Sequence, residues 1–141
     1  MEFKVKYFYL QCSDNFDTFI KTPESVREFV KGEFEYNEKM VVIGMNIKNK
    51  VIIKKDIAIG GYNTIACTPA DIFIPLLKVN ARNFVIIHNH PSDDASPSQE
   101  DITFTRNVNK AAKYIGLNFL DHLIVTVNEE NYYSFKKGGI L

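Results

Sequence analysis

The stretch that decides the fold runs from Phe84 to Asp101 and reads FVIIHNHPSDDASPSQED. Its first four residues form a continuous apolar run, which is typical of a short buried strand. The run leads directly into His88-Asn89-His90-Pro91, and a polar loop then extends to Ser98, where an N-cap residue favours the start of a helix. The stretch therefore predicts a buried strand, a polar loop and a helix in succession.

Two histidines lie where the predicted strand ends. Because side chains at positions i and i+2 of a strand point to the same side, His88 and His90 can present both imidazoles to one point. Asp101, on the first turn of the following helix, projects back toward the strand end as a third ligand. Two imidazoles and one carboxylate suit zinc and leave a fourth position for a water, whose pKa the metal would lower. Spacing alone favours a pair of surface histidines, and the alternative that it allows is a catalytic metal site.

Such a site also needs a carboxylic residue outside the metal ligands to transfer protons. Glu38 precedes the apolar segment Met40–Met45 and could face the same cleft. Spacing alone does not choose Glu38 over the other candidates, which are Glu24, Glu33, Glu35 and Glu100.

Ser98 and Asp101 also fit a structural pattern. The order Ser-x-x-Asp is a helix capping box, in which each residue bonds the backbone of the other. A cap is compatible with a functional role, since it would hold the Asp101 carboxylate in place. A second acid and imidazole are neighbours at Asp121-His122, and here a hydrogen-bonded structural pair is favoured over support of a metal ligand.

The rest of the chain predicts a mixed α/β domain with three helices and about six strands. Helices are expected to begin at Thr22-Pro23, at Thr68-Pro69 and at Ser98. The third helix should end at Gly116, and Pro75 should kink or shorten the second because its ring lacks a donor. Strands are expected at Phe3–Tyr9, in two runs within Met40–Ile53, at Phe84–Ile87, at Leu123–Val127 and at Tyr132–Phe135.

The composition indicates an ordinary globular protein. The chain has 141 residues, which suits one domain, and 45% of them are hydrophobic. Seventeen Lys and Arg balance seventeen Asp and Glu, which argues against a dedicated nucleic-acid module and against a polybasic membrane-surface protein. No apolar run approaches the roughly 20 residues of a membrane span, and the N-terminus does not read as a signal peptide. We expect a cytoplasmic protein in which Cys12 and Cys67 are reduced and Cys67 is an inert core thiol.

The residues from His88 to Asp101 resemble the signature of the JAB/MPN (JAMM) metalloenzymes, which is His-x-His, seven residues, then Ser-x-x-Asp. The surrounding sequence is similar to one bacterial branch, the RadC-like proteins. That similarity is carried by Thr22-Pro23-Glu24, by Glu38 with Met40-Val41-Val42-Ile43, by Cys67-Thr68-Pro69, by Asn80-Ala81, by Asp121-His122-Leu123-Ile124-Val125 and by Tyr133-Ser134-Phe135. The resemblance covers roughly residues 20–141, and we expect a single domain over 1–141.

The resemblance implies a fold and a set of roles. The fold would be a mixed β-sheet flanked by helices, of the cytidine-deaminase-like kind. His88, His90 and Asp101 would hold one Zn²⁺, Glu38 would be the general acid/base, and Ser98 would stabilise an oxyanion. The implied activity is zinc-dependent hydrolysis of amide or isopeptide bonds in a peptide or protein substrate. Isopeptide hydrolysis is the reaction of eukaryotic relatives, whereas the substrate of the RadC branch is unsettled.

The sequence departs from the RadC pattern in its loop and at its start. Asp93 stands where Gly is usual, and Asp is among the few other residues that tolerate a left-handed backbone; Ala95 replaces a frequent Pro. Only about 20 residues precede the shared domain, so the helix-hairpin-helix domain of longer RadC proteins is expected to be lacking.

Two alternative functions stay open at this point. One is a DNA-repair or recombination accessory domain, and the other is a metal-dependent phosphodiesterase. The zero net charge does not support a nucleic-acid partner, no membrane partner is expected, and the sequence predicts no oligomeric state.

Overall fold

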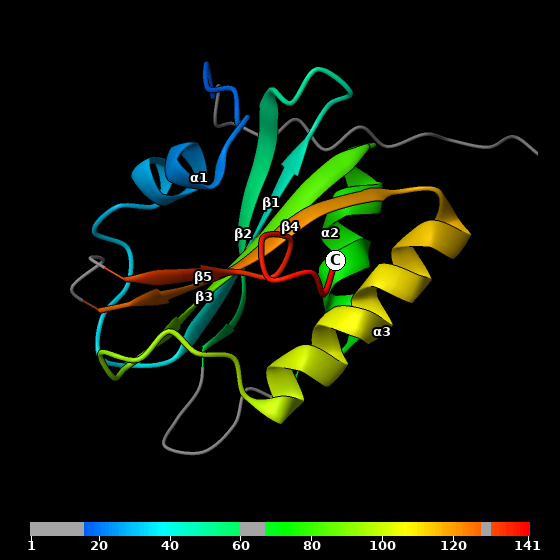
Figure 1. Cartoon of the computed structure of the whole chain (residues 1–141). Helices are drawn as coiled ribbons and strands as arrows, with labels where there is room; N and C mark the ends of the chain where they lie inside the picture. The colour runs from blue at the N-terminus through cyan, green and yellow to red at the C-terminus, as the bar shows by residue number, and fades with distance from the viewer. Residues whose placement is uncertain (1–15, 60–66, 128–130) are drawn as a thin grey trace, which may run out of the picture.

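The structure is a computed structural model of the chain, and it describes residues 16–59, 67–127 and 131–141. Within these ranges five strands form one mixed sheet in the order β2-β1-β3-β4-β5 (Figure 1). Their bounds are Lys39–Met45 for β1, Val51–Ile59 for β2, Asn83–His90 for β3, Asn118–Thr126 for β4 and Tyr132–Ser134 for β5. The predicted α/β class, a mixed sheet flanked by helices, is confirmed.

The centre of the sheet is the parallel pair of β3 and β4, whereas the other neighbouring strands are antiparallel. Parallel strands need a long crossover connection. Here it is α3, Gln99–Ile115, which leaves the end of β3 and returns to the start of β4. This crossover brings the first turn of α3 back to the carboxyl end of β3.

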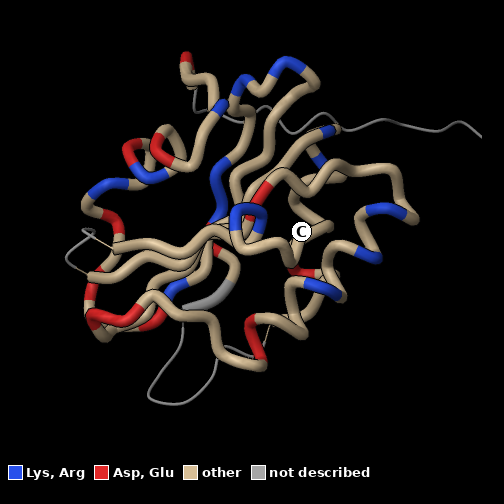
Figure 2. Tube along the Cα trace, viewed as in Figure 1, with Lys and Arg blue, Asp and Glu red and all other residues tan. Residues whose placement is uncertain are grey.

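The other helices are α1, Pro23–Phe29, and α2, Pro69–Lys78. All three helices begin as predicted, with N-cap residues Thr22, Thr68 and Ser98, each in a capping box. Gly116 ends α3 in the left-handed conformation, with φ of 77°, which a glycine adopts without strain. Figure 2 shows acidic residues at the start of α3 and basic residues toward its other end, an order that complements the helix dipole.

Pro75 was predicted to kink or shorten α2, and the prediction is wrong for the length of the helix. The helix continues to Lys78, three residues beyond the proline. Ile72, Phe73 and Leu76 are buried around Pro75, so tertiary packing outweighs the backbone hydrogen bond that the proline ring cannot donate.

Helices cover both faces of the sheet. On one face, Val41 and Ile43 of β1 and Val85 and Ile87 of β3 pack against Val26 of α1. On the other face, the alternate residues of the same strands pack against α2 and α3. The strand residues are Met40, Val42, Phe84 and Ile86, and the helix residues are Ile72, Leu76, Val108 and Ala112. Since side chains alternate along a strand, the even-numbered residues of β3 face α2 and α3. His88 and His90 therefore lie on that face, and Asn89 lies on the other.

The predicted hairpins are present, with some differences in extent. β2 extends to Ile59, and β4 begins at Asn118, five residues before the predicted start. The predicted strand at residues 3–9 lies outside the described residues. Among the helices of the described ranges, none has the length and apolar character needed to cross a bilayer.

Candidate metal centre

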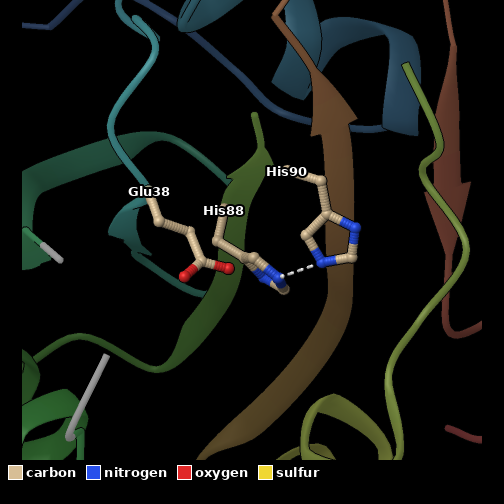
Figure 3. A group of neighbouring side chains, drawn as sticks. All are labelled: Glu38, His88 and His90. Carbon is tan, nitrogen blue, oxygen red and sulfur yellow. Dashed lines mark hydrogen bonds between the residues drawn. The ribbon is translucent and has the colours of Figure 1, made fainter. Parts of the chain in front are cut away.

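The carboxyl end of β3 brings together the two histidines of the His-x-His pair. Their Nε2 atoms lie 3.3 Å apart. Figure 3 shows the two rings and the Glu38 carboxylate directed toward one another. His88 is buried and His90 is half-buried, so the simpler interpretation of two surface histidines is wrong for this pair.

Asp101 reaches the same point from the first turn of α3. Its Oδ1 lies 3.3 Å from Nε2 of His88, and its Oδ2 lies 3.2 Å from Nε2 of His90. Burial by itself would raise the pKa of Asp101, but hydrogen bonds from His88 and His90 outweigh it and hold the pKa well below its usual range. The carboxylate is therefore ionised, as a metal ligand must be.

The capping box fixes this carboxylate. The Ser98 backbone N–H donates to Oδ2 of Asp101 over 2.8 Å, and the Asp101 N–H donates to Oγ of Ser98 over 3.0 Å. The structural and functional interpretations of Ser-x-x-Asp are therefore compatible here, because the cap that starts α3 also aims the carboxylate at the histidines.

The spacing of the three donors suits a zinc ion. Ligand atoms about 2.0–2.1 Å from a tetrahedral zinc lie about 3.3–3.4 Å from one another. The contacts among His88, His90 and Asp101 are 3.2–3.3 Å long, with Oδ1 of Asp101 facing His88 and Oδ2 facing His90. These residues could hold a metal without rearrangement of the backbone.

The outer ring nitrogens of both histidines have partners, as is usual for metal ligands. Nδ1 of His90 lies 3.1 Å from the backbone oxygen of Asp94, so this contact leaves Nε2 directed at the centre. The hydrogen bond with Asp101 raises the pKa of His90 above its usual value; burial opposes this change, and the bond to the Asp94 carbonyl adds to it.

Nδ1 of His88 lies 2.7 Å from Nε2 of His122, a residue of the neighbouring strand β4. His122 is fully buried and stacks on Phe135, with ring centroids 4.6 Å apart. Its Nδ1 lies 2.6 Å from the Thr105 hydroxyl of α3. Burial holds the pKa of His122 well below its usual value, so the ring is neutral.

The favoured interpretation of Asp121-His122 as a hydrogen-bonded pair holds for the backbone, since the His122 N–H donates to Oδ1 of Asp121 over 2.8 Å, but it is wrong for the imidazole. The two side chains point to opposite faces of β4. Asp121 accepts hydrogen bonds from the Ser134 hydroxyl and the Lys136 N–H, which is a structural role. His122 instead faces the centre because β4 pairs with β3 so that His122 lies opposite Ile86, two residues before His88 and on the same face of the sheet. That register depends on non-local pairing, and no local sequence signal reveals it.

Glu38 lies beside the histidines as predicted. Its carboxylate and the ring nitrogens of His88 and His90 lie within 4.8 Å of one another. The pairing of Met40 with His88 explains this position, since continuing the antiparallel register by two residues sets Glu38 opposite His90. Among the competing candidates, Glu24 bonds Tyr132 and Glu33 pairs with Lys54.

Asn89 holds the segment that carries Glu38. Its side-chain Nδ2 donates to the backbone oxygens of Glu35 and Asn37 over 2.9 and 3.0 Å, and its Oδ1 accepts from the Lys39 N–H over 2.7 Å. Sequence analysis did not identify this role, and the signal available was the position of Asn89 between two histidines on a strand, which sends its side chain to the opposite face.

A cleft of about 790 Å³ opens onto the centre. It extends from Glu38 and His88 along the N-terminal ends of α2 and α3. Cys67 lines this cleft and is half-buried against the edge of the core, so its predicted place in the core is only partly right. Burial, followed by the charge of Asp71, raises the pKa of Cys67 to about 11, so the thiol is protonated, consistent with the expected inert character.

The loop before α3 accommodates both departures from the RadC pattern. Among the described residues, the non-glycine positions with positive φ are Asn49 and Asn80, so Asp93 keeps an ordinary backbone and needs no left-handed conformation. Ala95 is buried against Ile124 and Phe135.

A mixed sheet with helices on both faces, and a His–His–Asp donor cluster with a neighbouring glutamate at the end of its central strand, defines a JAB-type domain. The chain belongs to the RadC-like JAB domain family, whose model matches residues 20–140. The family resemblance noted from the sequence is confirmed.

The relatives of this chain are similar over most of its length. It is 37% identical over 123 residues to a UPF0758 protein of Aquifex aeolicus, with 86% of this chain and 52% of the relative covered. It is 42% identical over 124 residues to a UPF0758 protein of Clostridium novyi, covering 86% and 54% of the two chains. A UPF0758 protein of Bacillus licheniformis is 34% identical over 134 residues, covering 94% and 58%. The chain thus spans about half the length of the curated relatives it matches, and their names state no activity.

Proposed function

We propose that this domain is a zinc-dependent hydrolase of amide or isopeptide bonds, with a peptide or protein as its substrate. The observation that carries the proposal is the 3.2–3.3 Å spacing among the donors of His88, His90 and Asp101. Three protein ligands at that spacing are typical of catalytic zinc sites, which keep a fourth position open. The family membership supports a JAB-type domain, and the activity is our inference from the site.

In this proposal His88, His90 and Asp101 hold the ion, and Glu38 moves protons. When bound, zinc supplies Lewis acidity, which polarises a carbonyl group and makes a water molecule more acidic. Glu38 lies within 4.8 Å of the histidine nitrogens, close enough to exchange a proton with a water molecule at the open position. Its carboxylate takes a proton from the attacking water and delivers it to the leaving nitrogen as the C–N bond breaks.

Ser98 stabilises the oxyanion that develops on the substrate carbonyl. Its oxygen accepts from the Asp101 N–H, and a hydroxyl that accepts a hydrogen bond can still donate its own hydrogen. The side chain is exposed and lines the cleft. A donor held in position by a helix cap is well suited to this role.

The charge of the cleft favours an amide over a phosphodiester as substrate. Its lining, within the part of the chain that the structure describes, includes the acids Glu38, Glu100 and Asp101 but no lysine or arginine. A nucleic-acid backbone needs basic side chains to neutralise its phosphates. Met40 and Phe104 give the wall apolar surface, which suits the side chains of a peptide.

The first test is metal content. We expect about one zinc ion per purified chain, as three ligands and an open position imply, and loss of that zinc in His88→Ala and Asp101→Ala. Asp17→Ala is the matched control, because it removes an exposed carboxylate whose partner is Lys50 at the surface. A folded wild-type chain that cannot be loaded with zinc would overturn the proposal.

The second test is the substrate. The zinc-loaded chain is incubated with peptide, isopeptide-linked and nucleic-acid panels, and we expect cleavage of amide bonds. Cleavage confined to nucleic acid would replace the proposal with a phosphodiesterase. Absence of cleavage with DNA binding that weakens steeply as salt rises would replace it with a DNA-associated accessory role.

A further inference from the structure

All three histidines of the chain meet at this centre. The sequence contains three, and they form a continuous series in which His90 contacts His88 and His88 contacts His122. His122 comes from β4 and is fully buried behind His88, away from the cleft. The role of a buried imidazole that supports another imidazole is not explained by packing alone.

The hydrogen bonds behind His88 have a definite direction. The Thr105 hydroxyl lies 2.7 Å from the backbone oxygen of Asp101 and 2.6 Å from Nδ1 of His122. A carbonyl oxygen can only accept, so the single hydroxyl hydrogen of Thr105 goes to Asp101. This bond to the residue four positions earlier is the usual one for a helical threonine. Nδ1 of His122 must then be the donor to Thr105.

The same reasoning gives the direction of the hydrogen bond between His88 and His122. A neutral imidazole that donates from Nδ1 carries a lone pair on Nε2, so Nε2 of His122 accepts from Nδ1–H of His88 over 2.7 Å. When a metal takes the place of the hydrogen bond between Nε2 of His88 and Asp101, that Nε2 carries the lone pair and Nδ1 keeps its hydrogen. Nε2 of His88 faces Nε2 of His90 and the Asp101 carboxylate. The reverse direction would need a charged His122. Among the residues that the structure describes, the side chains in contact with its ring are Thr105, His88, Phe104 and Phe135, and none of these is an acid.

We propose that His122 and Thr105 are positioning residues which hold His88 in its Nδ1–H tautomer, with the Nε2 lone pair directed at the metal position. The inference rests on the proposed metal centre. The same hydrogen bonds also connect two proposed ligands, because the series from the His88 ring through His122 and Thr105 ends on the backbone oxygen of Asp101. Neither residue touches the substrate or the ion.

The direct test uses the zinc-loaded wild-type chain. Long-range ¹H–¹⁵N spectra of imidazole side chains distinguish the two neutral tautomers, and three histidines give few signals to assign. In mildly alkaline solution, above the ordinary histidine pKa of about 6.5, we expect His88 and His122 both as Nδ1–H. A His122 that is predominantly Nε2–H would overturn the inference, whatever the activity.

The second test measures zinc affinity by competition with a chelator. Thr105→Val removes the hydroxyl with little change of shape, and we expect zinc affinity to fall about 10- to 100-fold, as for other residues that support metal ligands. Thr103→Val is the matched control, since its hydroxyl makes the same bond to the fourth preceding residue, Gln99, on the same helix. Its affinity should equal that of the wild type.

Two variants of His122 test whether a hydrogen-bond acceptor at this position restores zinc affinity. His122→Gln keeps an oxygen acceptor, whereas His122→Leu has none, so Gln should retain more zinc affinity than Leu. Equal affinity in the wild type and Thr105→Val would overturn the inference and leave the metal centre intact. Failure of the wild type to bind zinc would instead overturn the proposed function, so the two failures are distinguishable.

Discussion

The backbone N–H of Lys39 donates to the side-chain oxygen of Asn89 over 2.7 Å, across the join between β1 and β3. The same side chain donates to the backbone oxygens of Glu35 and Asn37. Asn89 therefore uses both ends of its amide to hold the segment that carries Glu38. The two histidines beside it face the opposite side of the strand, so one tripeptide positions both the proposed metal ligands and the proposed proton carrier.

Asn89→Asp tests this relationship. The variant keeps the accepting oxygen but loses both donors, and its carboxylate would face two backbone carbonyls. We expect a loss of about 1–3 kcal/mol in the free energy of unfolding for the unsatisfied buried groups. Zinc affinity should be retained, while hydrolysis falls on the order of 10²-fold because Glu38 is misplaced.

The control for this variant is Asn46→Asp, where the side-chain oxygen accepts from Lys48 and Lys50 at the tip of a hairpin. That acceptor survives the substitution, so activity should not change. An Asn89→Asp chain with wild-type hydrolysis would show that Asn89 does not position Glu38.

Glu38→Gln separates proton transfer from metal binding. The amide has the size of the carboxylate but cannot act as a base, so hydrolysis should fall about 10²- to 10⁴-fold. Zinc content should stay at the wild-type level, since the three proposed ligands are unchanged. Glu28→Gln on the exposed face of α1 is the control. Full activity in Glu38→Gln would remove this residue from the mechanism.

The local parts of this structure could be predicted from the sequence. Thr22, Thr68 and Ser98 each predict the start of a helix together with residues no more than four positions away, and the apolar run before His88 predicts a buried strand. The His-x-His pair and Asp101 were identified because two periodicities, that of a strand and that of a helical first turn, bring them together. These are features that short-range geometry decides.

The parts that escaped prediction depend on strand register and packing. His122 reaches His88 only because β4 pairs with β3 in one register, and Asn89 bonds residues about 50 positions earlier in the chain. Glu38 could not be separated from Glu24, Glu33, Glu35 and Glu100 until the pairing of β1 with β3 was known. Pro75 was expected to shorten α2, and burial of the surrounding side chains overrode that preference.

Zinc binding should depend on pH through His90. Because the hydrogen bond with Asp101 raises the pKa of His90, a proton occupies the imidazole to a higher pH than usual and competes with the metal. Affinity should therefore rise with pH up to that raised pKa and then level off. Competition titrations across this range measure the change. An affinity that does not vary with pH would contradict the assignment of His90 as a ligand.

In the metal-free chain, His90 and Asp101 should also make the free energy of unfolding depend on pH, and the contribution of His90 should fall as pH rises. The raised pKa of His90 contributes stability that is complete below the unfolded value and is lost as pH rises through the folded one. The lowered pKa of Asp101 contributes stability above its unfolded value and loses it as pH falls. The contribution of the pair should thus be largest between about pH 4 and about pH 6.5. Urea unfolding of the metal-free chain, compared with Asp101→Asn, measures that window.

Ser98→Ala distinguishes a helix cap from a catalytic donor. Loss of the cap should lower the free energy of unfolding by about 0.5–2 kcal/mol, and the Asp101 carboxylate loses part of its support. Thr22→Ala is the matched control, since Thr22 caps α1 through the Ser25 N–H, far along the chain from the metal ligands. Both variants should lose stability, but hydrolysis should fall only in Ser98→Ala. If that fall follows zinc affinity alone and vanishes at saturating zinc, Ser98 acts through Asp101; if it persists with the metal bound, the hydroxyl stabilises the oxyanion directly.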